Sequence, residues 1–437
     1  MTIRLTLLAL VAAALAAAPA SASGPVPLLA SSTVDDIAVA GPDVIVSRSG
    51  PLGAVRVDAL PSSGGPARSL LRTAPRGEDW IAFTVVAASP QRVAVVIDLI
   101  SPTAVFASQL YSGPPSGPLT LVEEVREGAT GWEPDDVAID GDRMLVREQN
   151  EDADRLRLFV SGSAPRVVRL AGPLTGYFAF AGDRLAYHSN ERLVLADLAT
   201  GSRLLSASAD DFGNLEVAAD GTMLADDDDA GVYTVKPSSL RQGIPDGEFL
   251  RTPRYAGNAI AAVQTTFSDA NRPVVLDADA IHPRPIGLPS STIDVVDADA
   301  AGVAWIANNC VLYAPVDAVA PAEPPAGPCA RAEVDVENAS FTVRGRRLRL
   351  LAKCVAATAA GCDGTVTIRE PGIRGRGAFH VDAGRQKRFD VRFTRRSVRR
   401  IRREVRQSED IFLDLTTRLT GGGRPDRDGE VFVDKVR

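Results

Sequence analysis

Short apolar runs broken by Gly or Asp turns repeat along most of this 437-residue chain. Most repeats read as strand, tight turn and strand, and the longer ones add a further turn and strand. The first turns recur every roughly 40 to 50 residues, which is the period of propeller blades. They lie at Gly41, Gln91, Gly141, Gly182, Asp220, Gly257 and Gly302. Because one blade cannot bury both of its faces alone, the pattern predicts an all-β fold with a propeller of about seven blades.

The last repeat offers only three strands, near 293–296, 303–307 and 310–314. The apolar segment 26–30 is the candidate for the missing outer strand. Its Pro27 is tolerable there, because an outermost strand leaves one side free of ladder hydrogen bonds. We therefore expect the N-terminal segment to complete the last blade and close the ring.

The repeats over about 32–315 resemble the WD40-like propellers of secreted and periplasmic bacterial proteins, of the TolB type. The stretch Ala219-Asp220-Gly221 partly matches the Ser-Pro-Asp-Gly turn of that type, whereas the Gly-His and Trp-Asp signatures of WD40 blades are missing. The resemblance is one of pattern, and it implies a bacterial exported propeller protein.

The first residues read as a signal peptide. Arg4 precedes an apolar run at 5–18, and Ala20-Ser21-Ala22 fits a cleavage site, so we expect a signal peptide at 1–22. No later run approaches the roughly 18 to 20 apolar residues of a membrane helix. The sequence therefore predicts a secreted or cell-envelope protein with no integral membrane segment after signal cleavage.

A second domain follows the propeller, which we place at 23–315. The stretch 316–329 is rich in Ala and Pro, as semi-rigid linkers are. Residues 330–437 contain eight short strand-like runs, which predict a small immunoglobulin-like β-sandwich. Within it, 394–406 is an Arg-rich segment with apolar residues on one helical face, which predicts a connecting helix. A solvated outer face is the favoured interpretation, with binding to anionic wall polymers or lipid headgroups as the alternative.

Cysteines and charge add two constraints. Four cysteines in an exported chain favour disulfides, and their local spacing pairs Cys310 with Cys329 and Cys354 with Cys362. A zinc site is the less favoured alternative, because its knuckles need closer spacing. The net charge is +10 over 330–437 and −18 over the rest of the mature chain. With an acidic chain outside the cell, a nucleic-acid partner is not expected.

The sequence contains no catalytic motif that we can recognise. Its three histidines, His188, His282 and His380, are scattered over different repeats, and no cofactor is predicted. Asp-rich strings such as 226–229 lack a complete calcium loop and are read as turns. We favour a non-catalytic binding or scaffold protein that presents a propeller face to a protein or glycan partner. The alternative is a secreted carbohydrate-active enzyme with carboxylates in the central funnel.

Three acidic pairs precede the first strand of their repeats and give the candidate binding residues. They are Asp35 and Asp36, Glu78 and Asp79, and Asp135 and Asp136. Equivalent positions of a propeller form a ring near the axis, where like charges would attract a cation or a basic ligand. Turn-forming and solubilising roles explain the same residues without a ligand.

Overall fold

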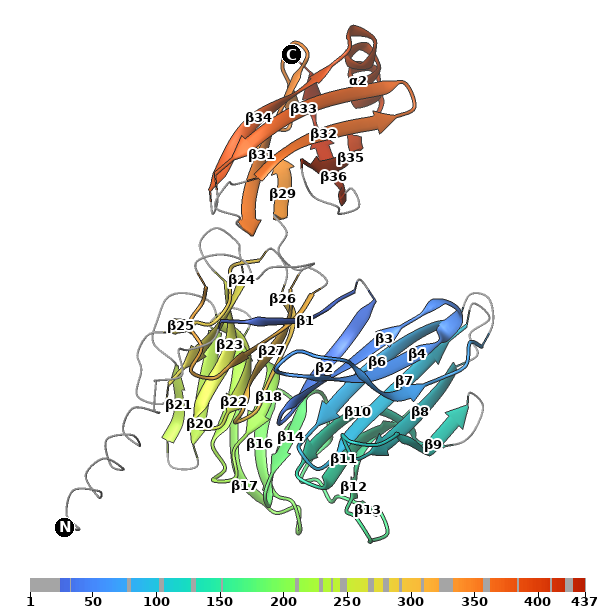
Figure 1. Ribbon diagram of the computed structural model, residues 1–437, viewed down its shortest axis with the longest axis vertical. Coiled ribbons are helices and arrows are strands. Elements are labelled where there is room, and N and C mark those ends of the chain that lie inside the picture. The colour runs from blue at the N-terminus through green and yellow to red at the C-terminus, as the bar shows by residue number, and fades with distance from the viewer. Residues whose placement is uncertain are drawn as a thin grey trace, which may run out of the picture.

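The computed structural model describes residues 24–436 with internal gaps, and the account below concerns those residues. The gaps are 32, 77–79, 102–105, 127–130, 151, 209–211, 228–230, 237–238, 244–249, 266–270, 278–282, 291–292, 308–309, 322–332, 357–361, 383–384, 409–410 and 421–426. Seven four-stranded antiparallel sheets form the blades of a β-propeller, and a further seven-stranded sheet forms the C-terminal domain (Figure 1). The predicted fold class is confirmed.

The first three blades are built from consecutive strands, innermost strand first. Blade 1 is β2 (Val34–Ala40), β3 (Asp43–Ser49), β4 (Val55–Pro61) and β5 (Arg68–Arg72), with a short 3₁₀ turn η1 (Pro51–Gly53). Blade 2 is β6 (Ile81–Ala88), β7 (Val93–Ile100), β8 (Phe106–Gly113) and β9 (Thr120–Arg126). Blade 3 is β10 (Glu133–Asp140), β11 (Arg143–Gln149), β12 (Asp154–Phe159) and β13 (Arg166–Val167).

The next three blades follow the same order, and blade 7 differs. Blade 4 is β14 (Phe178–Ala181), β15 (Arg184–His188), β16 (Arg192–Asp197) and β17 (Arg203–Ser208). Blade 5 is β18 (Phe212–Val217), β19 (Met223–Asp227), β20 (Gly231–Lys236) and β21 (Ser239–Gly243). Blade 6 is β22 (Leu250–Ala256), β23 (Ala259–Thr265), β24 (Asn271–Leu276) and β25 (Arg284–Pro285). Blade 7 combines β26 (Ile293–Ala298), β27 (Gly302–Ala307) and β28 (Cys310–Pro315) with β1 (Val26–Ala30).

The continuous apolar runs of the sequence follow from stacking on both faces of each blade. In β7, Val95 and Ile97 pack with residues of blade 1, whereas Ala94 and Val96 pack with residues of blade 3. A strand whose two faces are both buried favours apolar side chains at every position, so it reads as a nearly unbroken apolar run rather than an alternating one. The core is therefore a series of apolar layers between neighbouring blades.

The N-terminal strand closes the ring. Strand β1 pairs antiparallel with β28, with Val26 opposite Tyr313 and Ala30 opposite Cys310. Leu28 and Leu29 pack on the apolar layer between blade 7 and blade 1. The predicted completion of the last blade by this segment is confirmed.

The C-terminal domain has one helix and nine strands among its described residues. They are β29 (Glu333–Asn338), β30 (Thr342–Val343), β31 (Arg347–Ala356), β32 (Cys362–Glu370), β33 (Ile373–Val381), β34 (Gln386–Phe393), α2 (Arg395–Ser408), β35 (Ile411–Leu419), β36 (Arg427–Val433) and β37 (Lys435–Val436). Seven of them form one sheet in the order β29-β31-β34-β33-β32-β35-β36, and β30 pairs in parallel with β37.

This sheet curves until its two edges meet. The Asn338 side chain of β29 donates to the Phe432 carbonyl of β36 (2.9 Å) and accepts from the Phe432 amide (2.8 Å). The small β-sandwich thus takes the form of one nearly closed sheet, whereas an immunoglobulin domain stacks two separate sheets. The predicted connecting helix is present as α2, which covers the core with Val398 and Ile401. Thr394 caps this helix by accepting from the Ser397 amide (3.1 Å).

Candidate functional site

The innermost strands of several blades carry a β-bulge at the same place. In each of five strands one extra residue is inserted near the start of the pairing with the next strand, and such an insertion redirects the neighbouring side chains. The bulges lie between Val34 and Asp36, Pro134 and Asp136, Phe212 and Leu215, Arg251 and Arg254, and Ile293 and Val296. Two of the predicted acidic pairs therefore coincide with bulges.

The bulge in β2 sends Asp35 and Asp36 to different partners. Asp36 accepts from the Ile37 amide (2.9 Å) and from the Val86 amide of blade 2 (2.7 Å), and burial raises its pKa to about 7. Asp35 instead accepts from the Ser49 and Thr84 hydroxyls, which lie between blades 1 and 2. Burial also raises the pKa of Asp35.

The second pair behaves in the same way. Asp135 turns into its own blade, where it accepts from Arg147 Nε (2.6 Å) and Gln149 Nε2 (3.3 Å). Asp136 accepts from the Val137 amide (2.7 Å), and its pKa is raised by burial although Arg147 opposes this. The third predicted pair, Glu78 and Asp79, lies outside the described residues. Within each described pair, the second acid is the one that interacts electrostatically with Arg254 of blade 6.

Asp36 and four other aspartates also join neighbouring blades. The innermost strand of a blade is a sheet edge, so its outward N–H groups lack a ladder partner. Asp side chains supply the acceptor across the blade boundary. The donor and acceptor pairs are the Val86 amide to Asp36, Gly182 to Asp140, Thr252 to Asp226, Val39 to Asp297 and Gly41 to Asp299. The acids thus have a structural role in the ring, whatever else they do.

One cation lies among these carboxylates. Arg254 Nε is 3.5 Å from Glu216 Oε1 and 3.7 Å from Asp297 Oδ1, so the contact joins blades 5, 6 and 7. Burial alone would lower the pKa of Arg254, but Glu216, Asp297 and Asp36 together hold it above its ordinary value. About a quarter of each side chain stays exposed, at 24% for Arg254, 29% for Glu216 and 25% for Asp297. We call Asp36, Asp136, Glu216, Arg254 and Asp297 the axial cluster.

The backbone that carries Arg254 is strained. Thr252 has a φ of 48°, in the left-handed region that β-branched residues avoid, and it forms part of the bulge in β22. Asp226, only 4% exposed, accepts from the Thr252 amide (2.7 Å). Within the described part of the chain, Asp226 Oδ1 and Thr252 Oγ1 are buried without a hydrogen-bond partner. Strain and unpaired polar atoms of this kind gather at functional sites.

When its four carboxyl groups are ionised, the axial cluster has more negative charge than Arg254, together with Arg147 beside Asp136, can balance. Burial raises the pKa of Glu216 to about 7, against the lowering effect of Arg254, and burial also raises that of Asp297. The charge of the cluster therefore changes near neutral pH and becomes more negative above it. Such a site favours a positively charged ligand group. The described residues contain no group of three or more His, Cys, Asp or Glu that could hold a metal ion.

Sequence reasoning found two members of the cluster and missed Glu216, Arg254 and Asp297. A signal for two of these was present. Asp36, Asp136, Glu216 and Asp297 each lie five residues before a turn glycine, namely Gly41, Gly141, Gly221 and Gly302. Arg254 lies only three residues before Gly257 and escapes this rule.

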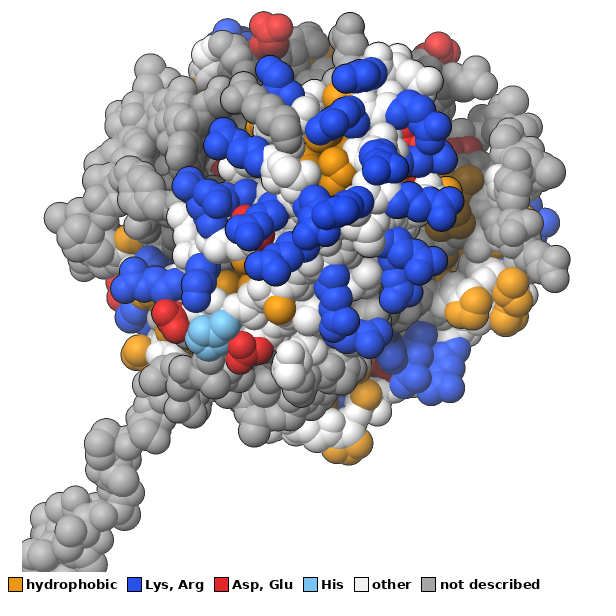
Figure 2. Space-filling model, turned by 90° about the horizontal axis from the view of Figure 1, so that it is seen from above, with side chains coloured by type: hydrophobic (Ala, Val, Ile, Leu, Met, Phe, Trp, Pro, Cys, Tyr) orange, Lys and Arg blue, Asp and Glu red, His pale blue; other side chains and the backbone are white. Residues whose placement is uncertain are grey.

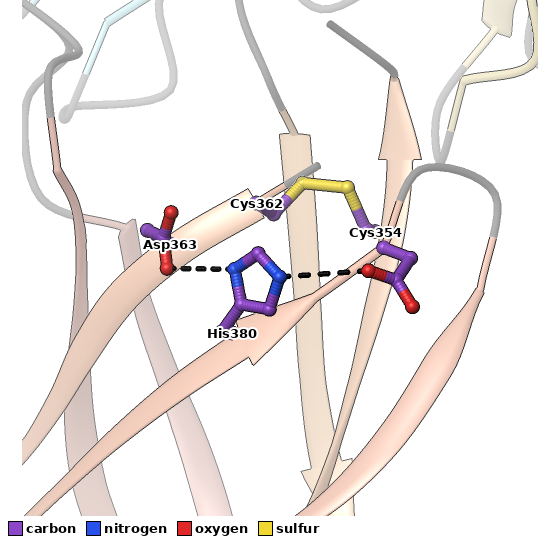
Figure 3. Close-up of a disulfide and its surroundings, with 5 residues drawn as sticks. Cys354, Cys362, Asp363 and His380 are labelled. Atoms are coloured by element: carbon purple, nitrogen blue, oxygen red, sulfur yellow. Dashed lines mark hydrogen bonds and ion pairs between the residues drawn. A yellow bond between two sulfur atoms is a disulfide. The ribbon is translucent and has the colours of Figure 1, made fainter. Parts of the chain in front are cut away.

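The two described histidines, His188 and His380, contact residues that do not belong to the axial cluster. His188 packs edge-on against Tyr177, and burial lowers its pKa although Asp226 opposes this. His282 is outside the described residues. His380 lies between two acids beside a disulfide, 2.8 Å from Asp363 and 3.5 Å from Asp382 (Figure 3).

One of the two predicted disulfides is present in the described residues. Cys354 and Cys362 are bonded, with their Cα atoms 5.7 Å apart (Figure 3). Cys329 lies outside the described residues, so the bridge from Cys310 to Cys329 stays a prediction.

The comparisons with known proteins assign the chain to no family. No protein-family model matches the sequence, and no curated protein matches it. Similar solved structures include Hsv2 of Kluyveromyces lactis, with 13% identity, a TM-score of 0.40 and coverage of 63% of this chain and 90% of that chain. The WD40 domain of SCAP from fission yeast is 9% identical with a TM-score of 0.35, covering 67% and 98%. The β-propeller domain of the Trilobed protease from Pyrococcus furiosus is 9% identical with a TM-score of 0.30, covering 58% and 97%.

These similarities are too distant to bear on function, and the propeller assignment rests on the strand pairing itself. The chain is a seven-bladed β-propeller protein with an additional small β-domain. No helix in the described part of the chain is both long and apolar enough to cross a membrane.

Proposed function

We propose that this chain is an exported, non-catalytic binding protein whose propeller axis accepts a cationic group of an envelope or extracellular partner. The observation that carries the proposal is the axial cluster, in which Arg254 acts on four carboxylates and Arg147 acts on Asp136 as well. A guanidinium or ammonium group of a protein, or the amine of an amino sugar, supplies the missing charge. Export, a bacterial source and kinship with TolB-type propellers belong to the same proposal and rest on the sequence.

Isothermal titration of the mature chain tests the binding role. The ligands are a short Arg-rich peptide and, separately, calcium alone. We expect the peptide to bind and the double variant Glu216→Gln/Asp297→Asn to bind it at least about tenfold more weakly, because close charge pairs are removed.

The matched control for this titration removes two acids that lie on the surface. Asp183→Asn/Asp382→Asn makes the same charge change at side chains that are 81% and 83% exposed. We expect this control to keep the wild-type affinity, and melting curves establish that both doubles are folded. Equal peptide affinity in the wild type and the axial double would refute the proposed site.

A second function is favoured by one specific observation. Retaining and inverting glycosidases need one carboxyl that holds its proton near neutral pH beside one that is ionised. Asp36 and Glu216, whose pKa values are raised to about 7, meet the first requirement. Release of sugar from polysaccharides by the wild type, abolished in Glu216→Gln, would establish the enzyme in place of the binding protein.

A further inference from the structure

The outer face of the C-terminal sheet is crowded with arginines. Along β31, β34, β33 and β32 alternate residues point into the core, among them Leu348, Val391 and Ile373, so the others point outward. Figure 2 looks onto this domain and shows Lys and Arg side chains gathered there. We call the following exposed residues the arginine face: Arg347, Arg349, Arg369, Arg374, Arg376, Arg388 and Arg392.

Strand register sets these arginines directly opposite one another. Arg392 of β34 pairs with Arg347 on one side and with Arg376 on the other, and Arg374 pairs with Arg369. Like charges in directly opposite positions destabilise a sheet. The domain therefore carries three such pairs side by side, which folding alone does not favour.

Few carboxylates offset this charge. Asp390, which lies on β34 between Arg388 and Arg392, is 3.5 Å from Arg347 and 3.4 Å from Arg349. In the described part of the chain, no ion pair reaches the four arginines Arg369, Arg374, Arg376 and Arg392. Their guanidinium groups are therefore available to an anion from outside.

The arginines of the face form a regular grid. Neighbouring strands lie about 4.8 Å apart and alternate residues of one strand about 6.8 Å apart, so the charges form a grid of that size. Each guanidinium can bind a phosphate through two parallel hydrogen bonds. A flexible polymer can follow such a grid over a curved surface, whereas a flat bilayer touches only its crest.

The other outward residues of these strands narrow the choice of polyanion. They include Thr365, Thr367 and Ala378, and none of the described outward positions in the four strands is a Phe, Tyr or Trp. Single-stranded nucleic acids are held by stacking of bases on aromatic rings, and insertion into a bilayer needs exposed apolar side chains. We propose that the arginine face binds a linear polyphosphodiester without bases, of the glycerol-phosphate kind.

Fluorescence anisotropy with a labelled poly(glycerol phosphate) and the full mature chain tests this proposal. We expect the wild type to bind, with log affinity falling against log salt at a slope of about −3, as for four or five phosphate contacts. Arg374→Gln/Arg376→Gln/Arg392→Gln is expected to lose at least about tenfold in affinity and to flatten the slope by about 2. Its melting temperature should stay equal or rise, because like charges are removed.

The matched control removes the same charge from the helix. Arg399→Gln/Arg402→Gln/Arg403→Gln changes three exposed arginines of α2 and is expected to bind within about twofold of the wild type. The axial double Glu216→Gln/Asp297→Asn should also bind normally, which separates this proposal from the function of the propeller. Equal losses in both arginine triples, or no binding by the wild type, would overturn the proposal. Tighter binding of a single-stranded oligonucleotide or of anionic phospholipid vesicles would assign the face to those partners instead.

Discussion

The two domains treat charge in opposite ways. The propeller draws carboxylates toward its axis, where each described acid of the axial cluster accepts a backbone N–H or faces Arg254. In the C-terminal domain the arginines are exposed and lie directly opposite one another on neighbouring strands. A buried charge has to find partners within the fold, so its position is constrained by folding. An exposed charge is solvated in place, so an unbalanced grid of them points to a partner outside the fold.

The two domains also differ in how their sheets are closed. The propeller is closed by a strand from the other end of the domain, which adds a full ladder and apolar contacts. The C-terminal sheet is closed by the Asn338 side chain and by the two-residue parallel pairing of β30 with β37, and the Cys354–Cys362 bridge adds a covalent link between β31 and β32. Closure over a long range makes the propeller dependent on its first strand.

Removal of that strand is expected to have the largest effect. A chain that starts at Thr33 loses the ladder of β1 and the packing of Leu28 and Leu29, together about 4 to 5 kcal/mol. For a domain of this size, the melting temperature should fall by about 10 °C or more. Calorimetry of this chain beside the mature chain from Ser23 is the measurement. Identical melting temperatures would mean that β1 does not hold the ring closed.

Loss of the axial arginine should come next. Arg254→Met leaves Glu216 and Asp297 without their cation, which we expect to cost about 3 kcal/mol at pH 8. The cost should shrink at pH 5, because Glu216 and Asp36, whose pKa values are about 7, are then protonated. Urea unfolding at the two pH values measures both. A cost independent of pH would show that Arg254 acts through packing alone.

The sequence anticipated those parts that depend on local pattern. The three-strand count of the last repeat was enough to predict the role of 26–30, and the turn spacing was enough to predict the blades. Strand pairing over long range was harder to predict. The eight strand-like runs after residue 330 do not show in which order the strands pair to make one curved sheet. Arg254 was inaccessible because it lies three residues before Gly257, whereas the four acids lie five residues before their glycines, and because it is a base where the other repeats have acids.

Protonation of Asp36 is expected to have a smaller effect on the free energy of unfolding, and the sign of this effect is defined. Burial raises the pKa of Asp36 from 3.8 to about 7, so between these values the folded chain holds a proton that the unfolded chain releases. This contribution is fully present below pH 3.8 and is lost as the pH rises through about 7. Asp36→Asn should therefore remove part of the decline in stability over this range.

The change in slope is bounded by one proton, which is about 1.4 kcal/mol per pH unit. We expect a fraction of that, because the side chain keeps some contact with water. Unfolding free energies at pH 5, 6 and 7 measure the slope, and Asp183→Asn, at a side chain 81% exposed, is the control with an unchanged slope. If Asp36→Asn and wild type keep parallel curves, Asp36 is ionised throughout and its role is that of a hydrogen-bond acceptor between blades.

The smallest effect is expected from a substitution of arginine by methionine in the C-terminal domain, the same exchange as Arg254→Met in the propeller. Arg392→Met removes a charge that lies opposite both Arg347 and Arg376, so it should stabilise the chain by about 0.5 kcal/mol, whereas Arg254→Met destabilises it. The gain should vanish in 1 M salt, where the screening length is about 3 Å and neighbouring guanidinium groups no longer repel. Thermal melting at low and high salt gives both values. A loss of 1 kcal/mol or more at low salt would mean that the Arg392 stem packs on the sheet as a structural element, and the contrast between a charge required by folding and one left for a partner would fail at this position.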